Sequence, residues 1–141
     1  MSLWEVAARE EIRDTIARYA HLVDRGRMDE VVALFADDGT LEAGHLPPVR
    51  GREAIREFLT GTKSRLAATA RTLVRHHVTS VTVDMKSPDA ATASSYFLVL
   101  GERGIDHWGL YRDTFVRVQG RWLFLHRRVR TDGRSADSWT R

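Results

Sequence analysis

An aspartate and a histidine in the last third of the sequence have the types and the spacing for acid–base chemistry. Gln119-Gly120 separates two strand-like runs, and a two-residue loop of this kind predicts a β-hairpin. With these residues as the loop, pairing places Asp113 opposite His126 on one face. Cross-strand partners lie about 4.5–5.5 Å apart at Cβ, so the two side chains could hydrogen bond, either as a catalytic pair or as a structural one.

The same register places further side chains on this face. It sets Phe115 opposite Phe124 and Tyr111 opposite Arg128. We expect Tyr111, Phe115 and His126 to contact a bound substrate. A β-bulge in the hairpin would shift the register and separate these partners.

The elements that precede the hairpin follow from hydrophobic periodicity. Apolar residues recur at three- and four-residue steps over residues 4–25, which predicts a long amphipathic helix, and Gly26 can close it in a left-handed conformation. A second helix over residues 28–35 should stop at Asp37-Asp38-Gly39. A short strand and a third helix are then predicted over residues 40–43 and 52–66.

The period then changes to two. Residues 72–85 alternate as a half-buried strand does, with His77, Val81 and Val83 on one face and His76 on the other. We therefore expect His76 at the surface or in an interface. Further strands are predicted over residues 91–102, 109–118 and 121–131, and His45 and His107 fall in predicted loops.

Helices followed by antiparallel strands indicate an α+β domain in which a curved sheet wraps around the helices as a cone. The open end of such a cone provides an apolar concavity of the kind that binds small molecules. We expect one domain over residues 1–131 and a polar tail over residues 132–141.

Composition narrows the classes of function. The chain has 141 residues, of which 43% are hydrophobic, and a formal net charge of +3 spread along the sequence, so neither nucleic acid nor a membrane is an expected partner. Cysteine is absent, which excludes disulfides and thiolate chemistry. There is no nucleotide fingerprint or phosphate loop, and the histidines do not converge as metal ligands do, so we expect no cofactor and no metal. Without a signal peptide or a membrane span, we expect a cytoplasmic protein.

Four segments resemble the SnoaL-like, nuclear-transport-factor-2-like (NTF2-like) superfamily: YAHLVDRGRMDEVVALFADDGTLEAG, VRGREAIREFL, RHHVTSVTVD and YRDTFVRVQGRWLFLHRRV. The similarity spans about residues 5–131. This superfamily includes SnoaL-type polyketide cyclases, ketosteroid isomerase, scytalone dehydratase and bile-acid 7α-dehydratase. The resemblance implies a cone of three N-terminal helices packed in a curved mixed or antiparallel sheet.

The resemblance also implies roles for particular residues. Tyr19 and Asp24 look like the tyrosine and aspartate at the pocket floor of the dehydratases, His77 looks like their catalytic histidine, and Arg130 is similar to a pocket arginine. A carboxylate beside a histidine fixes its tautomer and stabilises the imidazolium. His77 with Asp24 could then abstract a proton next to a carbonyl, while Tyr19 and Arg130 hold the enolate oxygen.

Three other positions bear on the type of reaction. Asp113 occupies the position where ketosteroid isomerase keeps a protonated aspartate, but Ala43 stands in place of that enzyme's catalytic base. Ser95 lies near the position of the second histidine of scytalone dehydratase. An isomerase mechanism of the ketosteroid type is thus disfavoured, and a scytalone-type site is incomplete.

The expected function is a cofactor-independent dehydratase, isomerase or cyclase that acts on a small apolar cyclic or polyketide-like compound. Phe35, Phe58 and Trp108 are expected to line its pocket. The alternative is a non-catalytic ligand-binding or subunit-interaction domain, like the small subunit of ring-hydroxylating dioxygenases. That alternative predicts a pocket filled by side chains, or His77 too far from Asp24 to interact. We expect a homodimer in both cases, because three helices cannot cover Trp122 and the other apolar residues of the late strands.

Overall fold

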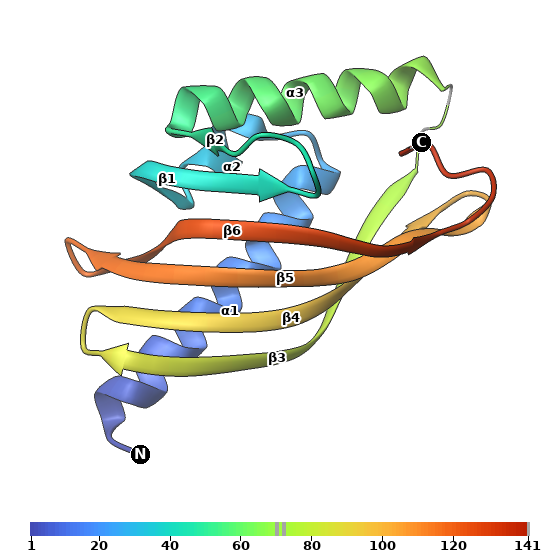
Figure 1. Cartoon of the computed structure of the whole chain (residues 1–141). Helices are drawn as coiled ribbons and strands as arrows, with labels where there is room; N and C mark the ends of the chain where they lie inside the picture. The colour runs from blue at the N-terminus through green and yellow to red at the C-terminus, as the bar shows by residue number, and fades with distance from the viewer. Residues whose placement is uncertain (70, 72, 141) are drawn as a thin grey trace.

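A curved, unclosed sheet of six strands, with helices packed against it, forms the fold (Figure 1). The computed structural model describes residues 1–69, 71 and 73–140. The elements are α1 (Leu3–Asp24), α2 (Met28–Val32), β1 (Phe35–Ala43), β2 (Val49–Arg50), α3 (Arg52–Ala68), β3 (Val74–Ser87), β4 (Ala90–Gly101), β5 (Gly104–Val118) and β6 (Arg121–Arg134). The strand order is β2-β1-β6-β5-β4-β3, with β1 parallel to β6 and the other neighbours antiparallel. The predicted α+β cone is confirmed.

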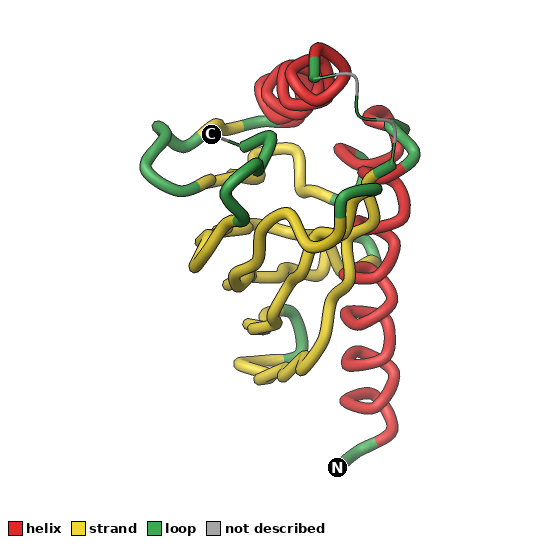
Figure 2. The backbone as a smooth tube through the Cα atoms, turned by 90° about the vertical axis from the view of Figure 1, so that its right-hand side faces the viewer, coloured by secondary structure: helices red, strands yellow, loops and turns green. Residues whose placement is uncertain are grey.

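Helix α1 covers the inner face of the sheet and ends beside it. Its buried stripe includes Ile12, Ile16 and Tyr19, which pack with aromatic side chains of the strands in one core. Figure 2 shows the helix running along one side of the strands. Gly26 follows with φ +69°, the left-handed conformation that glycine adopts without steric cost, so α1 stops at Asp24. None of the described helices is both long and apolar enough to cross a membrane.

Strand β1 is longer than predicted and α2 is shorter. Asp37 and Asp38 were expected to end the second helix, but they lie inside β1 with their side chains exposed. The pairing of β1 with β6 is interrupted between Phe35 and Thr40, where Gly39 packs closely against the backbone. This irregularity accommodates the two exposed acids between the buried residues Ala36 and Gly39.

A β-bulge in β3 reverses the predicted faces of this strand. Ser80 has φ 56°, and the register with β4 shifts between Thr79 and Thr82. On either side of the bulge, His76 and Val83 both pair with buried residues on the inner face of β4. His76 therefore faces the helices and His77 faces outward, which corrects the assignment made from uninterrupted alternation. Thr72, where the predicted strand began, lies outside the described residues.

A second bulge changes the β5–β6 hairpin. The predicted pairing of Phe115 with Phe124 is confirmed, but the register shifts immediately beyond it. Asp113 consequently lies opposite Arg127, and His126 lies opposite Thr114, so the predicted Asp113–His126 pair is wrong. Tyr111 pairs with Val129 rather than with Arg128.

The carboxyl-terminal residues are more ordered than a polar tail. Strand β6 continues to Arg134, and Ser138 is buried against Asp106 of β5. Trp122 is also buried within the single chain, where its N–H donates to Glu11 at 2.7 Å. Its predicted exposure therefore does not support a dimer.

Candidate functional site

A histidine and an aspartate from distant parts of the chain form a tightly held dyad. Asp24 is the last residue of α1, and the β3 bulge turns His76 toward it. Nδ1 of His76 lies 2.5 Å from Oδ1 of Asp24, and the backbone N–H of His76 donates to Oδ2 at 2.9 Å. Both carboxylate oxygens thus hold the same residue, and the side chains are only 14% and 9% exposed.

This contact decides which ring nitrogen of His76 can react. A carboxylate only accepts hydrogen bonds, so the neutral form of this imidazole has its proton on Nδ1 and its lone pair on Nε2. Nε2 makes no hydrogen bond to any residue in the described ranges. The residue types and the geometry of this dyad are therefore those of a general base that is held in a fixed orientation.

The histidine expected in this role lies on the other face of the sheet. His77 is exposed and lines an open groove of about 540 Å³ together with Thr79, Tyr96, Trp108 and other residues of the outer surface. Trp108, a predicted pocket residue, is therefore also outside the cone. Alternation carried through Ser80 placed His77 instead of His76 on the inner face, because the bulge adds one residue to the strand.

Two buried phenols lie near the dyad. The rings of Tyr19 and Tyr111 meet edge to face with centroids 6.3 Å apart. Burial raises the pKa of both hydroxyls, and the charge of Asp24 adds to the rise at Tyr111. Both groups therefore stay protonated at neutral pH and can donate a hydrogen bond.

The floor of the cone holds a fully buried ion pair. Nε of Arg127 lies 3.1 Å from Oδ1 of Asp113, with both side chains 0% exposed. The guanidinium carbon lies 3.5 Å from the ring centre of Tyr111 and 4.2 Å from that of Tyr19, within the range of cation–π attraction. Burial raises the pKa of Asp113 to about 6, although the positive charge of Arg127 opposes the rise.

The arginine in the interior of the cone is Arg127, and not Arg130 as the resemblance implied. Arg130 lies on the outer face, where its Nε donates to Asp132 at 2.8 Å. His126 is also directed outward, with Nε2 3.1 Å from Oε2 of Glu42. The error at His126 follows from the bulge beyond Phe124, which a simple alternating pattern does not reveal, whereas Arg130 was named from the resemblance.

The remaining predicted pocket residues are mostly packing residues. Phe35 and Phe115 are 0% exposed and pack on Phe124, with ring centroids 5.1 and 4.6 Å away. Phe58 of α3 is partly buried against the same core. Among these predicted residues, only Tyr111 lies near the dyad, close enough to Asp24 for that charge to raise the pKa of the Tyr111 hydroxyl.

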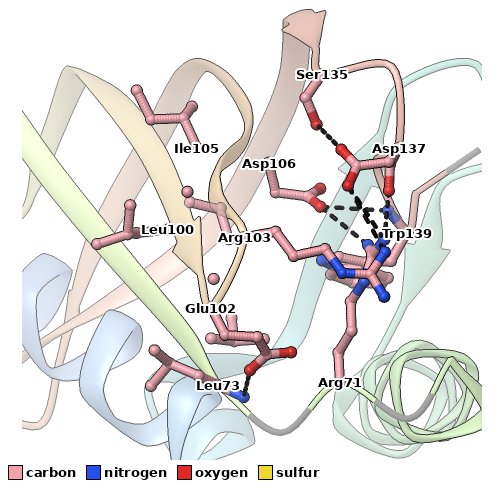
Figure 3. A pocket seen from close by; sticks show the side chains of 14 residues that line it. Arg71, Leu73, Leu100, Glu102, Arg103, Ile105, Asp106, Ser135, Asp137 and Trp139 are labelled. Carbon is pink, nitrogen blue, oxygen red and sulfur yellow. Dashed lines mark hydrogen bonds and ion pairs between the residues drawn. The ribbon is translucent and has the colours of Figure 1, made fainter.

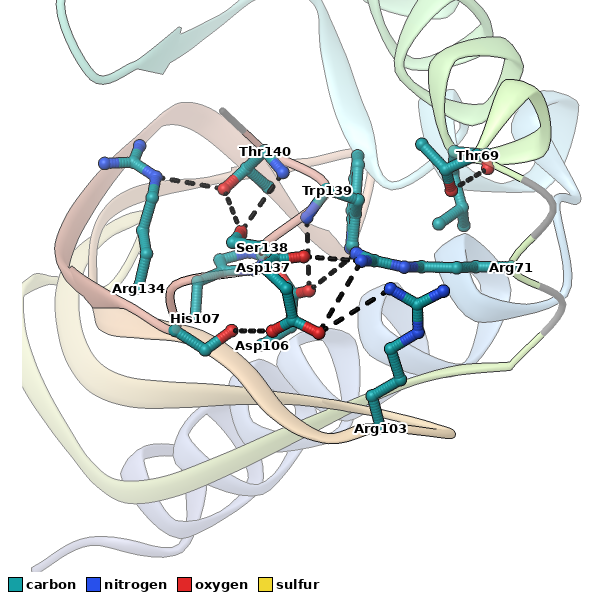
Figure 4. A network of polar contacts seen from close by, with 12 residues as sticks. Thr69, Arg71, Arg103, Asp106, His107, Arg134, Asp137, Ser138, Trp139 and Thr140 are labelled. Atoms are coloured by element: carbon teal, nitrogen blue, oxygen red, sulfur yellow. Dashed lines mark hydrogen bonds and ion pairs between the residues drawn. The ribbon is translucent and has the colours of Figure 1, made fainter.

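A second histidine–aspartate pair lies at the end of the sheet, where the sequence analysis expected a loop. Nδ1 of His107 is 2.8 Å from Oδ2 of Asp106, and the same carboxylate accepts bonds from Ser138 and Arg71 (Figure 4). Arg71 and Asp106 also line a small hollow with Trp139, which has room for about one water molecule (Figure 3). Across the described residues, no three histidine or acidic side chains gather as a metal site would require.

Comparison with known proteins places this geometry in a family. Among solved structures, a candidate scytalone dehydratase from Novosphingobium aromaticivorans is 25% identical with a TM-score of 0.83, over 96% of this chain and 91% of the other. An NTF2-like protein with a cystatin-like fold from the same species is 29% identical with a TM-score of 0.79, over 99% and 96%. LinA is 18% identical with a TM-score of 0.83, over 96% and 94%, a likeness of fold. The family model of the SnoaL-like domain matches residues 4–128, and the chain therefore belongs to the SnoaL-like domain family.

Proposed function

We propose that this protein removes a proton from a carbon next to a carbonyl group and so acts as a cofactor-independent dehydratase, isomerase or cyclase on a small apolar molecule. His76 is the general base, in place of His77. The observation that carries the proposal is the two-point contact of Asp24 with the ring and the backbone of His76. That contact fixes both the tautomer and the direction of the imidazole.

The proposed reaction begins with transfer of the carbon-bound proton to Nε2 of His76. The imidazolium that forms is stabilised by the carboxylate of Asp24, and the electron pair moves onto the carbonyl oxygen as an enolate. Tyr19 and Tyr111 are placed to donate hydrogen bonds to that oxygen, and each such donor typically contributes a few kcal/mol. Arg127 strengthens both phenols as hydrogen-bond donors, because a cation against each ring stabilises the partial negative charge that the phenol oxygen gains when it donates.

Three outcomes complete the proton balance. In dehydration, the enolate expels a β-hydroxyl group, which leaves as water with the proton from His76. In isomerisation, His76 returns the proton to another carbon. In cyclisation, the enolate carbon attacks a second carbonyl, and the alkoxide that forms takes the proton from His76. The likeness to a candidate scytalone dehydratase favours dehydration among these.

The test measures proton abstraction without knowledge of the natural substrate. The ketone 2-tetralone in heavy water exchanges its α-hydrogens for deuterium, which NMR follows directly. The parent protein should accelerate exchange, and His76→Gln should lower the rate by at least about a hundredfold, as removal of a general base does. His77→Gln makes the same change one residue away on the outer face and should leave the rate unchanged. Equal rates in the parent and in His76→Gln would refute the proposal.

A second candidate function, that of a non-catalytic ligand-binding or subunit-interaction domain, is favoured by how densely the cone is filled. Phe35, Phe115 and Arg127 occupy its floor with no exposed surface, and neither of the hollows described above is lined by His76. A protein of this kind would not accelerate the exchange of 2-tetralone, so the same experiment separates the two functions.

We also propose a homodimer formed through the outer face of the sheet. Tyr96, Ile105 and Trp108 are 60%, 51% and 41% exposed, and they line one groove on that face. Contiguous exposed apolar surface of this kind marks an interface in many proteins.

A further inference from the structure

The inner face of the sheet carries a second imidazole close to the proposed base. His76 on β3 and His107 on β5 both pair with Val99 of β4, which is 0% exposed. Directly paired residues of antiparallel strands share a face, so these three residues form one row across the cone. Two strand spacings separate the histidine backbones, which is about 10 Å. A positive charge on His76 would lower the pKa of His107, so the two side chains lie within range of electrostatic interaction.

The protonation of His107 follows from its contact with Asp106. That carboxylate accepts hydrogen bonds from Ser138 at 2.7 Å and from Arg71 at 3.2 Å as well as from His107. Burial acts to raise the pKa of Asp106, but the hydrogen bonds from Ser138, His107 and the backbone N–H of Trp139 hold it below its ordinary value. Asp106 therefore remains ionised and Nδ1 of His107 carries the proton. Burial lowers the pKa of His107 despite this partner, and the ring is therefore neutral at pH 7.

The ring of His107 is also fixed in direction. Phe97 meets it edge to face at 5.9 Å and Trp139 does so at 5.8 Å, with interplanar angles of 72° and 78°. The backbone of Trp139 is also held, because its backbone N–H donates to Asp106 at 3.3 Å and Arg71 donates to the neighbouring backbone oxygen of Asp137 at 2.5 Å. The carboxyl-terminal segment thus holds the imidazole in place (Figure 4).

We propose that Nε2 of His107 accepts a hydrogen bond from a hydroxyl or N–H group of the substrate. This group lies across the cone from the carbon that His76 deprotonates. Nε2 makes no hydrogen bond to any residue that the structure describes, and the ring lies against the apolar side chains of Phe97 and Trp139. This inference rests on the proposed function and names a feature of its substrate. Nε2 of a neutral ring protonated at Nδ1 can accept a hydrogen bond but has no proton to donate. His107 therefore cannot protonate a leaving hydroxyl, and the group that it binds stays on the substrate during the reaction.

The test compares phenol with fluorobenzene, which has a similar shape and lacks the donor. The indole N–H signal of Trp139 reports binding by NMR in every variant, because this side chain contacts His107. A buried neutral hydrogen bond contributes about 0.5–1.5 kcal/mol, so the parent should bind phenol about three- to tenfold more tightly than fluorobenzene. In His107→Phe, which keeps a flat ring, this preference should fall below about twofold. His77→Phe is the matched control on the outer face and should keep the preference.

A second measurement needs no variant. Nitrogen chemical shifts of the parent protein should show His107 neutral at pH 7, with the proton on Nδ1, and phenol should shift the Nε2 signal. A protonated Nε2, no response to phenol, or a preference for phenol that survives in His107→Phe would each overturn the inference. If the parent protein shows no preference for phenol but still accelerates tetralone exchange, this inference alone is refuted. If the parent prefers phenol but does not accelerate exchange, the proposed function alone is refuted.

Discussion

Replacement of Arg127 by methionine tests whether Arg127 and Asp113 form the buried ion pair that the structure shows. Methionine fills a similar volume, but it leaves Asp113 fully buried without its countercharge. Breaking a buried pair in this way costs about 3–5 kcal/mol of unfolding free energy, because the remaining charge is neither hydrated nor paired. For a urea dependence of about 2 kcal/mol per M, the midpoint of unfolding should fall by about 2 M.

The matched comparison removes both charges. Arg127→Met combined with Asp113→Leu leaves no buried charge, and its midpoint should return to within about 1 M of the parent. Arg130→Met removes an arginine from the exposed face of the same strand, and it should change the unfolding free energy by less than about 0.5 kcal/mol. Urea unfolding followed by circular dichroism measures all three. A single Arg127→Met variant as stable as Arg130→Met, or a double variant as unstable as the single one, would refute this reasoning.

Two further predictions concern pH and assembly. The pKa of Asp113 is about 6 in the fold and 3.8 ordinarily, so between these values the native state keeps a proton that the unfolded chain has released. Stability should therefore fall by about 3 kcal/mol as pH rises from about 4 to about 6; urea unfolding at several pH values should show this slope in the parent and not in Asp113→Asn. Trp108→Glu places a charge in the outer groove and should convert a dimer to a monomer in sedimentation experiments, while an unchanged mass would contradict an interface there.

The sequence identified the fold and part of the site for different physical reasons. The helices and strands follow from periodicity, which is set by many residues and tolerates local errors. Tyr19 and Asp24 came from a resemblance, and the structure places both within the cone because the apolar stripe of α1 fixes their direction. The face of each strand residue is a less robust prediction, since a single added residue reverses it.

Both reversals arose at bulges that the sequence does not mark. Ser80 adopts a positive φ angle that glycine or asparagine would have signalled, and Leu125 beside the second bulge has an ordinary side chain for a strand. His107 was missed for another reason. Its strand was expected to begin at Gly109, and Arg71 and Ser138, which bind its partner Asp106, lie in segments without hydrophobic periodicity.

The charges in the cone constrain how an enolate could be stabilised there. Arg127 and Asp113 cancel one another at neutral pH, so this pair offers little net positive charge to a substrate. Asp24 carries a negative charge, which favours the imidazolium of His76 but repels an enolate. The developing oxyanion must therefore be met by neutral donors, and Tyr19 and Tyr111 are protonated phenols at the required depth. A site of this kind suits a neutral, largely apolar substrate, because a second negative charge would have no counterpart inside the cone.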